Sequence, residues 1–239
     1  MSDRRLEGRV ALVTGASRGY GAAVAVRLAA EGAQVILAAR TTGGLEETDD
    51  AVRRAGGTAA TLVPLDLADG DAADRLGAAI YQRFRRLDIL IGNAAVLGSL
   101  RPVGHFDPAD WQRLMAVNLT ANWRLMRSFD ALLRQSDAGR AVFVTCGQAA
   151  SFTPYWSAYA ASKAALEVLA RTWAAEVGRV TRLRVNLVDP GPMRTRLRAE
   201  AFPGEDRDSL KEPAAAAGLV ADLAMPDCAR NGEIVRFAE

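Results

Sequence analysis

The chain has 239 residues, of which 50% are apolar and 24% charged, and its formal net charge is +2. This length suits one α/β domain with a sizeable core. The small net charge, with no basic run interleaved with aromatics, excludes a nucleic-acid surface. Two cysteines cannot form a disulfide framework, and no apolar stretch is as long as a membrane span. The composition therefore predicts a soluble cytoplasmic protein, and its arginine and alanine bias indicates a bacterial origin.

Short β-branched runs alternate with longer helical patterns along the whole chain. In chain order we expect strand 9–14, helix 19–31, strand 34–39, helix 44–55, strand 58–65, helix 71–85, strand 87–91, helix 108–133, strand 141–146, helix 158–177, strand 183–188, helix 213–223 and strand 234–237. Continuous apolar strands joined by helices are typical of a parallel sheet covered on both faces. The pattern predicts one doubly wound, Rossmann-like α/β domain over residues 1–239, with a seven-stranded parallel sheet.

Segment 190–212 interrupts this alternation. It contains three prolines, two glycines and eight arginine, aspartate or glutamate residues before Glu212. The segment is too long and too polar for a simple connection, and loops of this kind tend to be lids or binding segments. We therefore expect a substrate loop or lid here.

A glycine-rich turn, Thr14-Gly15-Ala16-Ser17-Arg18-Gly19-Tyr20-Gly21, connects the first expected strand to a helix. Its glycines permit a tight turn and let a diphosphate approach backbone N–H groups at the helix N-terminus. After the second strand, Arg40 stands where an acid would hold the ribose 2′-hydroxyl of NAD. Arginine suits a 2′-phosphate, with Arg18 as a second cation, so the sequence favours NADP(H) over NAD(H). The alternative is that Arg40 only faces solvent.

Tyr159 and Lys163 are spaced by one helical turn, in a chain with only one other lysine, Lys211. Residues i and i+4 of a helix lie on one face. A cation beside a phenol favours the phenolate and lowers its pKa from the usual value of about 10. That shift would suit proton transfer near neutral pH. The alternative, for this pair alone, is an accidental pairing on a solvated helix face.

Together these motifs resemble the short-chain dehydrogenase/reductase family. The resemblance rests on Thr14-Gly15-xxx-Gly19-x-Gly21, Asp66, Asn93-Ala94-Ala95, Asn118, Tyr159-xxx-Lys163 and Pro190-Gly191, and it runs from Gly8 to the end of the chain. It implies hydride transfer between a nicotinamide and a carbonyl or alcohol carbon. Tyr159 would be the general acid or base, Lys163 would hold the nicotinamide ribose and lower the tyrosine pKa, and Asn118 would support a proton-relay water.

The resemblance also implies which residues contact cofactor and substrate. The expected cofactor-binding residues are Gly15, Ser17, Arg18, Gly19, Tyr20, Gly21, Arg40, Asp66, Leu67, Asn93, Ala94, Ala95, Tyr159, Lys163, Pro190, Gly191, Met193 and Thr195. Asp66 would accept from the adenine amino group, unless it caps the following helix. Tyr20 would place its ring near the nicotinamide.

Val96, Tyr155 and Trp156 are expected to contact the substrate. The alternative for the aromatics of segment 152–156 is packing in the core or at a subunit interface. A homodimer or homotetramer, assembled through helices 108–133 and 158–177, is also implied by the resemblance. No metal is expected, since the sole histidine, His105, lacks a cluster of partner ligands.

Cys146 departs from the family pattern. Thirteen residues before the tyrosine, the family usually has a serine that donates a hydrogen bond to the reacting oxygen. A thiol is a weak donor, and loss of one oxyanion donor costs about 10²–10³ in rate. The neighbouring Thr145 should point to the other face of the strand. Cys146 thus leaves open a slower reductase, a site adapted to another substrate, or a weakly active or non-catalytic NADP-binding sensor or structural subunit.

Overall fold

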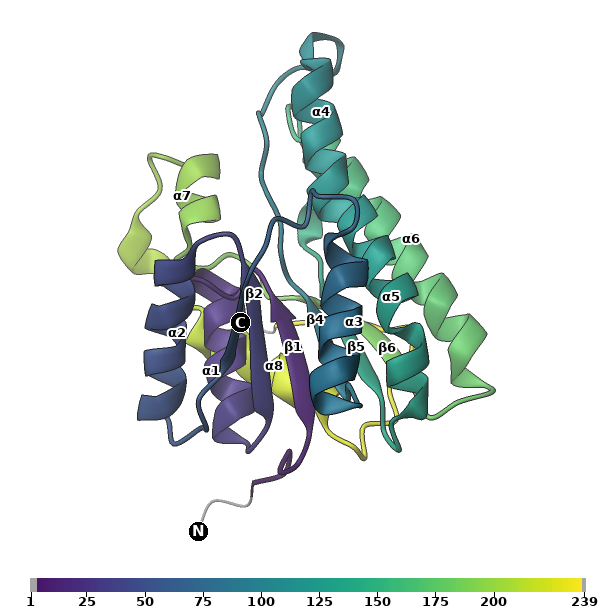
Figure 1. Ribbon diagram of the computed structural model, residues 1–239. Coiled ribbons are helices and arrows are strands. Elements are labelled where there is room, and N and C mark those ends of the chain that lie inside the picture. The colour runs from purple at the N-terminus through teal and green to yellow at the C-terminus, as the bar shows by residue number, and fades with distance from the viewer. Residues whose placement is uncertain (1–3, 238–239) are drawn as a thin grey trace.

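The computed structural model describes residues 4–237, and its central element is a seven-stranded sheet (Figure 1). The strands are β1 (Val10–Thr14), β2 (Gln34–Ala39), β3 (Thr61–Pro64), β4 (Ile89–Gly92), β5 (Arg140–Val144), β6 (Arg184–Asp189) and β7 (Ile234–Arg236). Their spatial order is β3-β2-β1-β4-β5-β6-β7, and every neighbouring pair is parallel. The predicted doubly wound α/β fold is confirmed. The strand order reverses between β1 and β4, which is where such sheets bind ligands.

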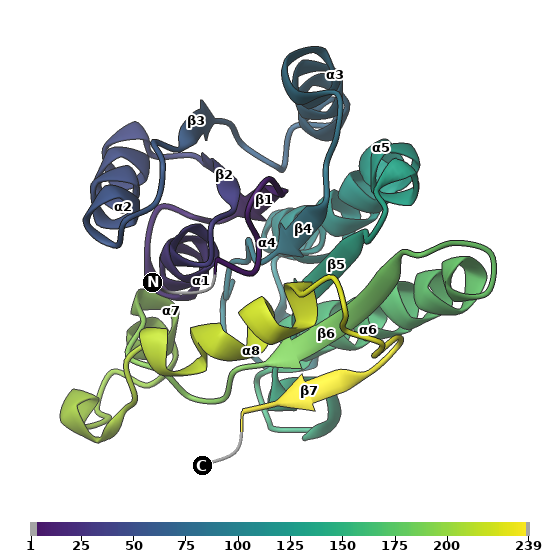
Figure 2. The ribbon, with the colours of Figure 1, turned by 90° about the horizontal axis from the view of Figure 1, so that it is seen from below.

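Helices cover both faces of this sheet (Figure 2). One face carries α1 (Gly19–Ala30), α2 (Thr42–Arg54) and α8 (Ala214–Ala224), and the other carries α3 (Ala72–Phe84), α5 (Ala121–Gln135) and α6 (Ser157–Gly178). The expected helix 108–133 is divided into α4 (Pro108–Met115), a π-helical turn (Ala116–Thr120) and α5. Short 3₁₀ turns lie at Val103–His105, Gly147–Ala150 and Arg207–Ser209.

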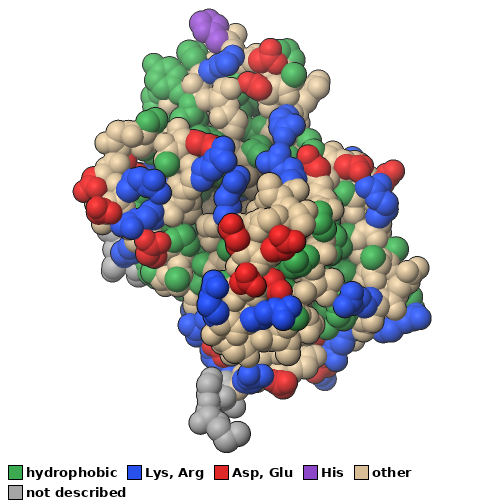
Figure 3. Space-filling model, turned by 60° about the vertical axis from the view of Figure 1, so that its left-hand side comes forward, with side chains coloured by type: hydrophobic (Ala, Val, Ile, Leu, Met, Phe, Trp, Pro, Cys, Tyr) green, Lys and Arg blue, Asp and Glu red, His purple; other side chains and the backbone are tan. Residues whose placement is uncertain are grey.

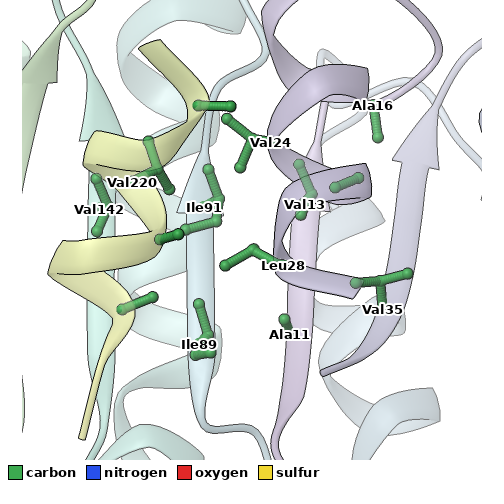
Figure 4. Close-up of a cluster of buried hydrophobic side chains, with 14 of the residues drawn as sticks. Ala11, Val13, Ala16, Val24, Leu28, Val35, Ile89, Ile91, Val142 and Val220 are labelled. Carbon is green, nitrogen blue, oxygen red and sulfur yellow. The ribbon is translucent and has the colours of Figure 1, made fainter. Parts of the chain in front are cut away.

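The core consists of two apolar layers, one on each side of the sheet. Ala11 and Val13 of β1 pack with Val24 of α1 and Val220 of α8 (Figure 4), whereas Leu12 belongs to the opposite layer. Successive strand residues point to opposite faces, so a strand buried on both sides must be apolar throughout. This requirement explains the continuous apolar runs of the sequence.

Segment 190–212, expected as a polar loop, contains the short helix α7 (Arg196–Ala201). The Thr195 hydroxyl begins the helix by accepting from the Arg198 N–H at 3.2 Å. Ion pairs join Arg194 to Asp208 at 3.1 Å and Arg198 to Glu205 at 2.5 Å. The segment is therefore ordered by its own charged side chains.

Within residues 4–237, no helix has the length and apolar character needed to cross a membrane.

Candidate active site

A cavity of about 460 Å³ opens at the carboxyl ends of the strands, the upper edge of the sheet in Figure 1. Figure 3, which brings the left-hand side of Figure 1 forward, shows Lys and Arg side chains gathered beside a hollow. The cavity is lined by every residue expected from the sequence to contact cofactor, by Cys146, and by Val96 and Trp156. Of the expected site residues, Asn118 and Tyr155 do not line it. Residues 180 positions apart in the chain thus meet in one hollow, as the fold predicts.

The glycine turn after β1 is shaped by close backbone contacts. Gly15 and Gly19 have φ angles of +64° and +59°, which favour glycine. A Cβ on Gly21 would lie 2.3 Å from Asn93 Nδ2 and 2.4 Å from the Gly15 carbonyl oxygen. Asn93 Nδ2 in turn donates to the carbonyl oxygens of Thr14 at 2.9 Å and Gly15 at 3.2 Å. Asn93 therefore ties the turn to the end of β4, a structural contact that adds to its place in the cavity wall.

Arg18 and Arg40 are exposed and line the cavity. In the part of the chain described, neither guanidinium takes part in an ion pair, whereas those of Arg194, Arg196 and Arg198 do. Two positive charges at this end of the cavity therefore remain free to meet an anion.

Asp66 lies at the cavity edge, exposed, after β3. Its Oδ1 accepts from the Ala68 N–H at 2.9 Å, whereas α3 begins only at Ala72. The side chain therefore closes a local turn and does not cap the helix.

Tyr159 and Lys163 lie on one buried face of α6, with 7% and 2% of their surfaces exposed. The Lys163 Nζ lies 5.8 Å from the centre of the Tyr159 ring. It donates a hydrogen bond to the Val144 carbonyl oxygen, at 2.8 Å, at the end of β5. The spacing that the sequence showed therefore does place the ammonium beside the phenol.

The pKa of Tyr159 is nevertheless raised, where the sequence led us to expect a lowered one. Burial of the phenol is the largest cause, and the neighbouring Cys146 and Asp189 add to it. Burial likewise lowers the pKa of Lys163, against opposing effects of Cys146 and Glu167. Desolvation disfavours the charged form of both groups. Tyr159 is thus a protonated phenol at neutral pH.

Cys146 follows β5 and begins the turn Gly147–Ala150. Burial raises the pKa of its thiol, and Lys163 offsets part of that rise. The two nearby hydroxyls are engaged elsewhere, since Thr145 donates to Glu167 Oε1 at 2.5 Å and Ser151 to Gln148 Oε1 at 2.5 Å. The thiol therefore stands alone at the position where the resemblance described above implies a serine hydroxyl.

Asn118 lies in the π-helical turn and is fully buried. Its Oδ1 accepts from the Val96 N–H at 2.9 Å, and its Nδ2 donates to the Val96 carbonyl oxygen at 3.0 Å and to Ser162 Oγ at 3.1 Å. The amide thus holds the segment after β4 against α6. The side chain is occupied by these three contacts. Its role in a proton relay stays a prediction.

Tyr20 lies largely within the core and reaches the cavity with only a small exposed part; its contact with a nicotinamide stays a prediction. Its ring packs among α1 and α8 residues, and its hydroxyl donates to the Ala216 carbonyl oxygen at 3.0 Å. Burial raises the pKa of this phenol as well. The ring therefore joins α1 to α8 beside the cavity.

Trp156 forms an apolar wall next to Tyr159. The two rings meet edge to face at 5.8 Å, and Trp156 also packs on Phe202 of the α7 segment at 5.6 Å. By contrast, Tyr155 is 58% exposed and Phe152 94%, both with positive φ angles. The three aromatics therefore separate, because the strained turn directs two of them outwards and only Trp156 into the site.

Sequence reasoning missed Asp189 and Gln148, which also line the cavity. Asp189 is 8% exposed, and its Oδ1 accepts from the Gly191 N–H at 3.0 Å. Its position directly before Pro190-Gly191, at a strand end, was a usable signal. Gln148 lies in an irregular turn and gave no such signal. No cluster of three His, Cys, Asp or Glu suitable for a metal occurs among residues 4–237.

Comparisons with known proteins agree with this geometry. Residues 9–206 match the family model described as short chain dehydrogenase. The uncharacterized oxidoreductase YciK of Escherichia coli K12 is 38% identical over 211 residues, which cover 87% of this chain and 83% of that protein. An uncharacterized NAD-dependent oxidoreductase of Mycobacterium tuberculosis H37Rv is 36% identical over 198 residues, or 77% of this chain and 71% of that one.

Among solved structures, an Escherichia coli CFT073 protein assigned to the short chain dehydrogenases and complexed with NADPH is closely similar. It is 36% identical, superposes with a TM-score of 0.93, and the match covers 99% of both chains. The glycine turn, the Tyr159–Lys163 pair and these matches lead to one conclusion. The chain belongs to the short-chain dehydrogenase family of oxidoreductases.

Proposed function

We propose that the protein is an NADP(H)-dependent oxidoreductase that transfers a hydride between the nicotinamide and a carbonyl or alcohol carbon. The observation that carries this proposal is a single cavity lined both by the glycine turn with Arg18 and Arg40 and by Tyr159 with Lys163. Hydride chemistry comes from the nicotinamide when it is bound, and the protein supplies position and electrostatics.

The residues of the cavity fit a phosphorylated dinucleotide. At Gly21 there is no room for a Cβ, and the turn leads into the 12-residue helix α1, whose first N–H groups attract a diphosphate. Arg18 and Arg40 are exposed and free of ion pairs in the described chain, so they can contact a 2′-phosphate. The NADPH complex of the E. coli structure supports this choice, and the mycobacterial relative named as NAD-dependent makes it worth testing.

Tyr159 is suited to donate a proton to the substrate oxygen. The raised pKa keeps the phenol protonated near neutral pH, so the residue acts as a general acid as negative charge develops on that oxygen. The Lys163 ammonium, 5.8 Å from the ring centre, stabilises the phenolate that remains. In this protonated form Tyr159 can serve the reduction of a carbonyl. Cys146, beside the phenol, offers only a weak donor to the same oxygen.

The substrate would lie against apolar side chains next to Tyr159. Val96, Trp156, Leu197 and Ala201 line this part of the cavity. Leu197 and Ala201 come from α7, so segment 190–212 would form part of the substrate wall and cover it. We infer an apolar group next to the reacting carbonyl.

The direct test is NADPH consumption against a panel of ketones, aldehydes and acyl thioesters. Tyr159→Phe should lower turnover by about 10²–10⁴, the usual contribution of a positioned acid, while NADPH binding is retained. Arg40→Ala should weaken NADPH binding roughly tenfold and leave NADH binding unchanged, because only NADPH carries the extra phosphate.

The competing proposal, a weakly active or non-catalytic NADP-binding protein, is favoured by Cys146 alone. It would prevail if the wild type bound NADPH but showed no reductase activity above that of Tyr159→Phe.

A further inference from the structure

Glu167 lies one helical turn beyond Lys163 on α6, as Lys163 lies one turn beyond Tyr159. Residues at this spacing share a helix face. The Glu167 carboxylate accepts a hydrogen bond from Thr145 Oγ1 at 2.5 Å, and Thr145 is 2% exposed. The proton transfer proposed above makes no use of this partly buried acid.

The Lys163 ammonium needs a counter-charge. It is 2% exposed, and its hydrogen bond goes to a neutral acceptor, the Val144 carbonyl oxygen. A buried charge is costly unless an opposite charge or several hydrogen bonds compensate it. Two groups favour the charged form of Lys163, namely Cys146 and Glu167. Burial raises the pKa of the Cys146 thiol and so disfavours its charged form, which leaves the Glu167 carboxyl group as the candidate counter-charge.

The two α6 side chains also contact consecutive residues at the end of β5. Lys163 binds the Val144 carbonyl oxygen, and Glu167 binds the Thr145 hydroxyl. The next residue is Cys146, whose thiol faces Tyr159. A change at Glu167 would therefore reach both the lysine and the backbone that carries the thiol.

We propose that Glu167 is a positioning residue of the active site, whose carboxylate balances the buried Lys163 ammonium and, through Thr145, fixes the end of β5. The catalytic consequence rests on the proposed function, whereas the charge balance itself does not. The carboxylate acts through Lys163 and contacts no reacting atom.

Other ionisable groups around this pair must be kept constant in a test. Tyr159 and Cys146 face Lys163 from α6 and from the end of β5, and Asp189 acts on both of them from the end of β6. Arg171 follows Glu167 by one turn on α6 and donates through Nε to the Gly232 carbonyl oxygen. None of these is altered by the substitutions below.

The test uses the fact that the chain has only two lysines, Lys163 and Lys211. Protein grown with lysine labelled with ¹³C at Cε gives two titrating NMR signals, and Lys211→Arg assigns them. The Lys163 signal is followed against pH in wild type, Glu167→Gln and Thr145→Val. Glutamine keeps an acceptor for Thr145 but removes the charge, and valine removes the hydrogen bond but leaves the charge.

We expect the titration midpoint of Lys163 to move to lower pH in Glu167→Gln and to stay closer to the wild-type value in Thr145→Val. Glu167→Asp, which keeps the charge, should restore the midpoint in part, and the circular dichroism spectrum of each variant, compared with that of wild type, shows that it is folded. An unmoved midpoint in Glu167→Gln, or equal movement in Glu167→Gln and Thr145→Val, would overturn the proposal. No turnover is measured, so these outcomes are independent of the reductase assignment.

Discussion

The Cys146 thiol lies beside the Tyr159 hydroxyl and has two opposing effects on proton transfer. As a weak donor it gives a developing oxyanion less stabilisation than a hydroxyl would. Once ionised in alkaline solution, the thiolate would also oppose ionisation of Tyr159, the proposed proton donor, and so add to the effect of burial on its pKa. At neutral pH the thiol is protonated, so its weakness as a donor is the effect that acts there.

We predict that Cys146→Ser keeps or raises carbonyl reductase turnover at neutral pH, because the phenol is already protonated there and the hydroxyl is the better donor. Reduction requires the protonated phenol, so activity falls as pH rises through the pKa of Tyr159. Removing the thiol should lower that pKa and move the alkaline decline to lower pH.

The measurement is kcat against pH for a substrate found in the panel, with Cys228→Ser as the matched control. Cys228 is also partly buried but lies after α8, away from the cavity lining. A tenfold or greater fall in turnover for Cys146→Ser would show that the thiol has a chemical role of its own.

At the residue scale, the spacing of residues along the sequence predicted which side chains lie together, but not how deeply each one is buried. The i, i+4 relation of Tyr159 and Lys163 is a local property of a helix, and the structure places the two together. The pKa direction depends on burial by segments far away in sequence, and there the prediction was wrong. Tyr20 and Tyr155 illustrate the same limit, because sequence alone does not show whether a ring faces a core, a cavity or solvent.

At the element scale, a stack of side chains joins α6 to α7. Trp156, at the start of α6, packs on Phe202, which follows α7. The Arg198 guanidinium lies 3.8 Å from the centre of the Phe202 ring, and Glu205 holds it through two hydrogen bonds at 2.6 and 2.5 Å. The short helix α7 thus owes part of its position over the cavity to one aromatic contact.

We predict that Phe202→Ala loosens segment 190–212. Loss of an aromatic pair and a cation–π contact removes about 1–2 kcal/mol, so local opening and cleavage of the segment should become roughly tenfold faster. Limited trypsin digestion measures this, because Arg194, Arg196, Arg198, Arg207 and Lys211 all lie in the segment.

Phe152→Ala is the matched control, since Phe152 is 94% exposed and should leave cleavage at the wild-type rate. Equal rates for wild type and Phe202→Ala would mean that the stack does not hold α7 in place.

The elements predicted best are those whose apolar runs face the two core layers. The segment β2 was predicted with its exact bounds for this reason. The six-residue helix α7, Arg-Leu-Arg-Ala-Glu-Ala, is too short for a helical period to appear, and it was missed. The π-helical turn was also missed, because it leaves the apolar pattern of α4 and α5 continuous.

At the scale of the whole molecule, the two edges of the sheet serve different purposes. The carboxyl edge holds the cavity, and the sequence placed it correctly because motifs follow strand ends. The amino edge is tied together by Asp88, which is fully buried and was not noticed in the sequence. Assembly into a homodimer or homotetramer stays a prediction, since it depends on surfaces of a second copy.

Asp88 joins three segments of the chain through four donor residues. It accepts hydrogen bonds from the Val10 N–H at 2.9 Å, from Ser136 Oγ at 2.6 Å, and from the guanidinium groups of Arg86 at 2.7 Å and Arg9 at 3.3 Å. Burial alone would raise the pKa of this carboxyl. The hydrogen bonds from Arg86, Ser136 and Val10 outweigh burial, so the pKa of Asp88 is lowered.

We predict that Asp88→Asn lowers the free energy of unfolding by about 3 kcal/mol at pH 7, because it removes one partner of a buried charged network. The pKa of Asp88 is lower in the folded than in the unfolded protein, so its contribution is complete above the unfolded value of about 3.9. It is lost as the pH falls through the folded value. Urea midpoints at pH 7, 5 and 4 should therefore show a constant difference from wild type down to about pH 5, and a smaller one below.

Asp137→Asn, which removes an exposed partner of Arg9, should stay near the wild-type midpoint throughout. A gap between Asp88→Asn and wild type that persisted unchanged in acid would show that lost packing, and not lost charge, destabilises the variant.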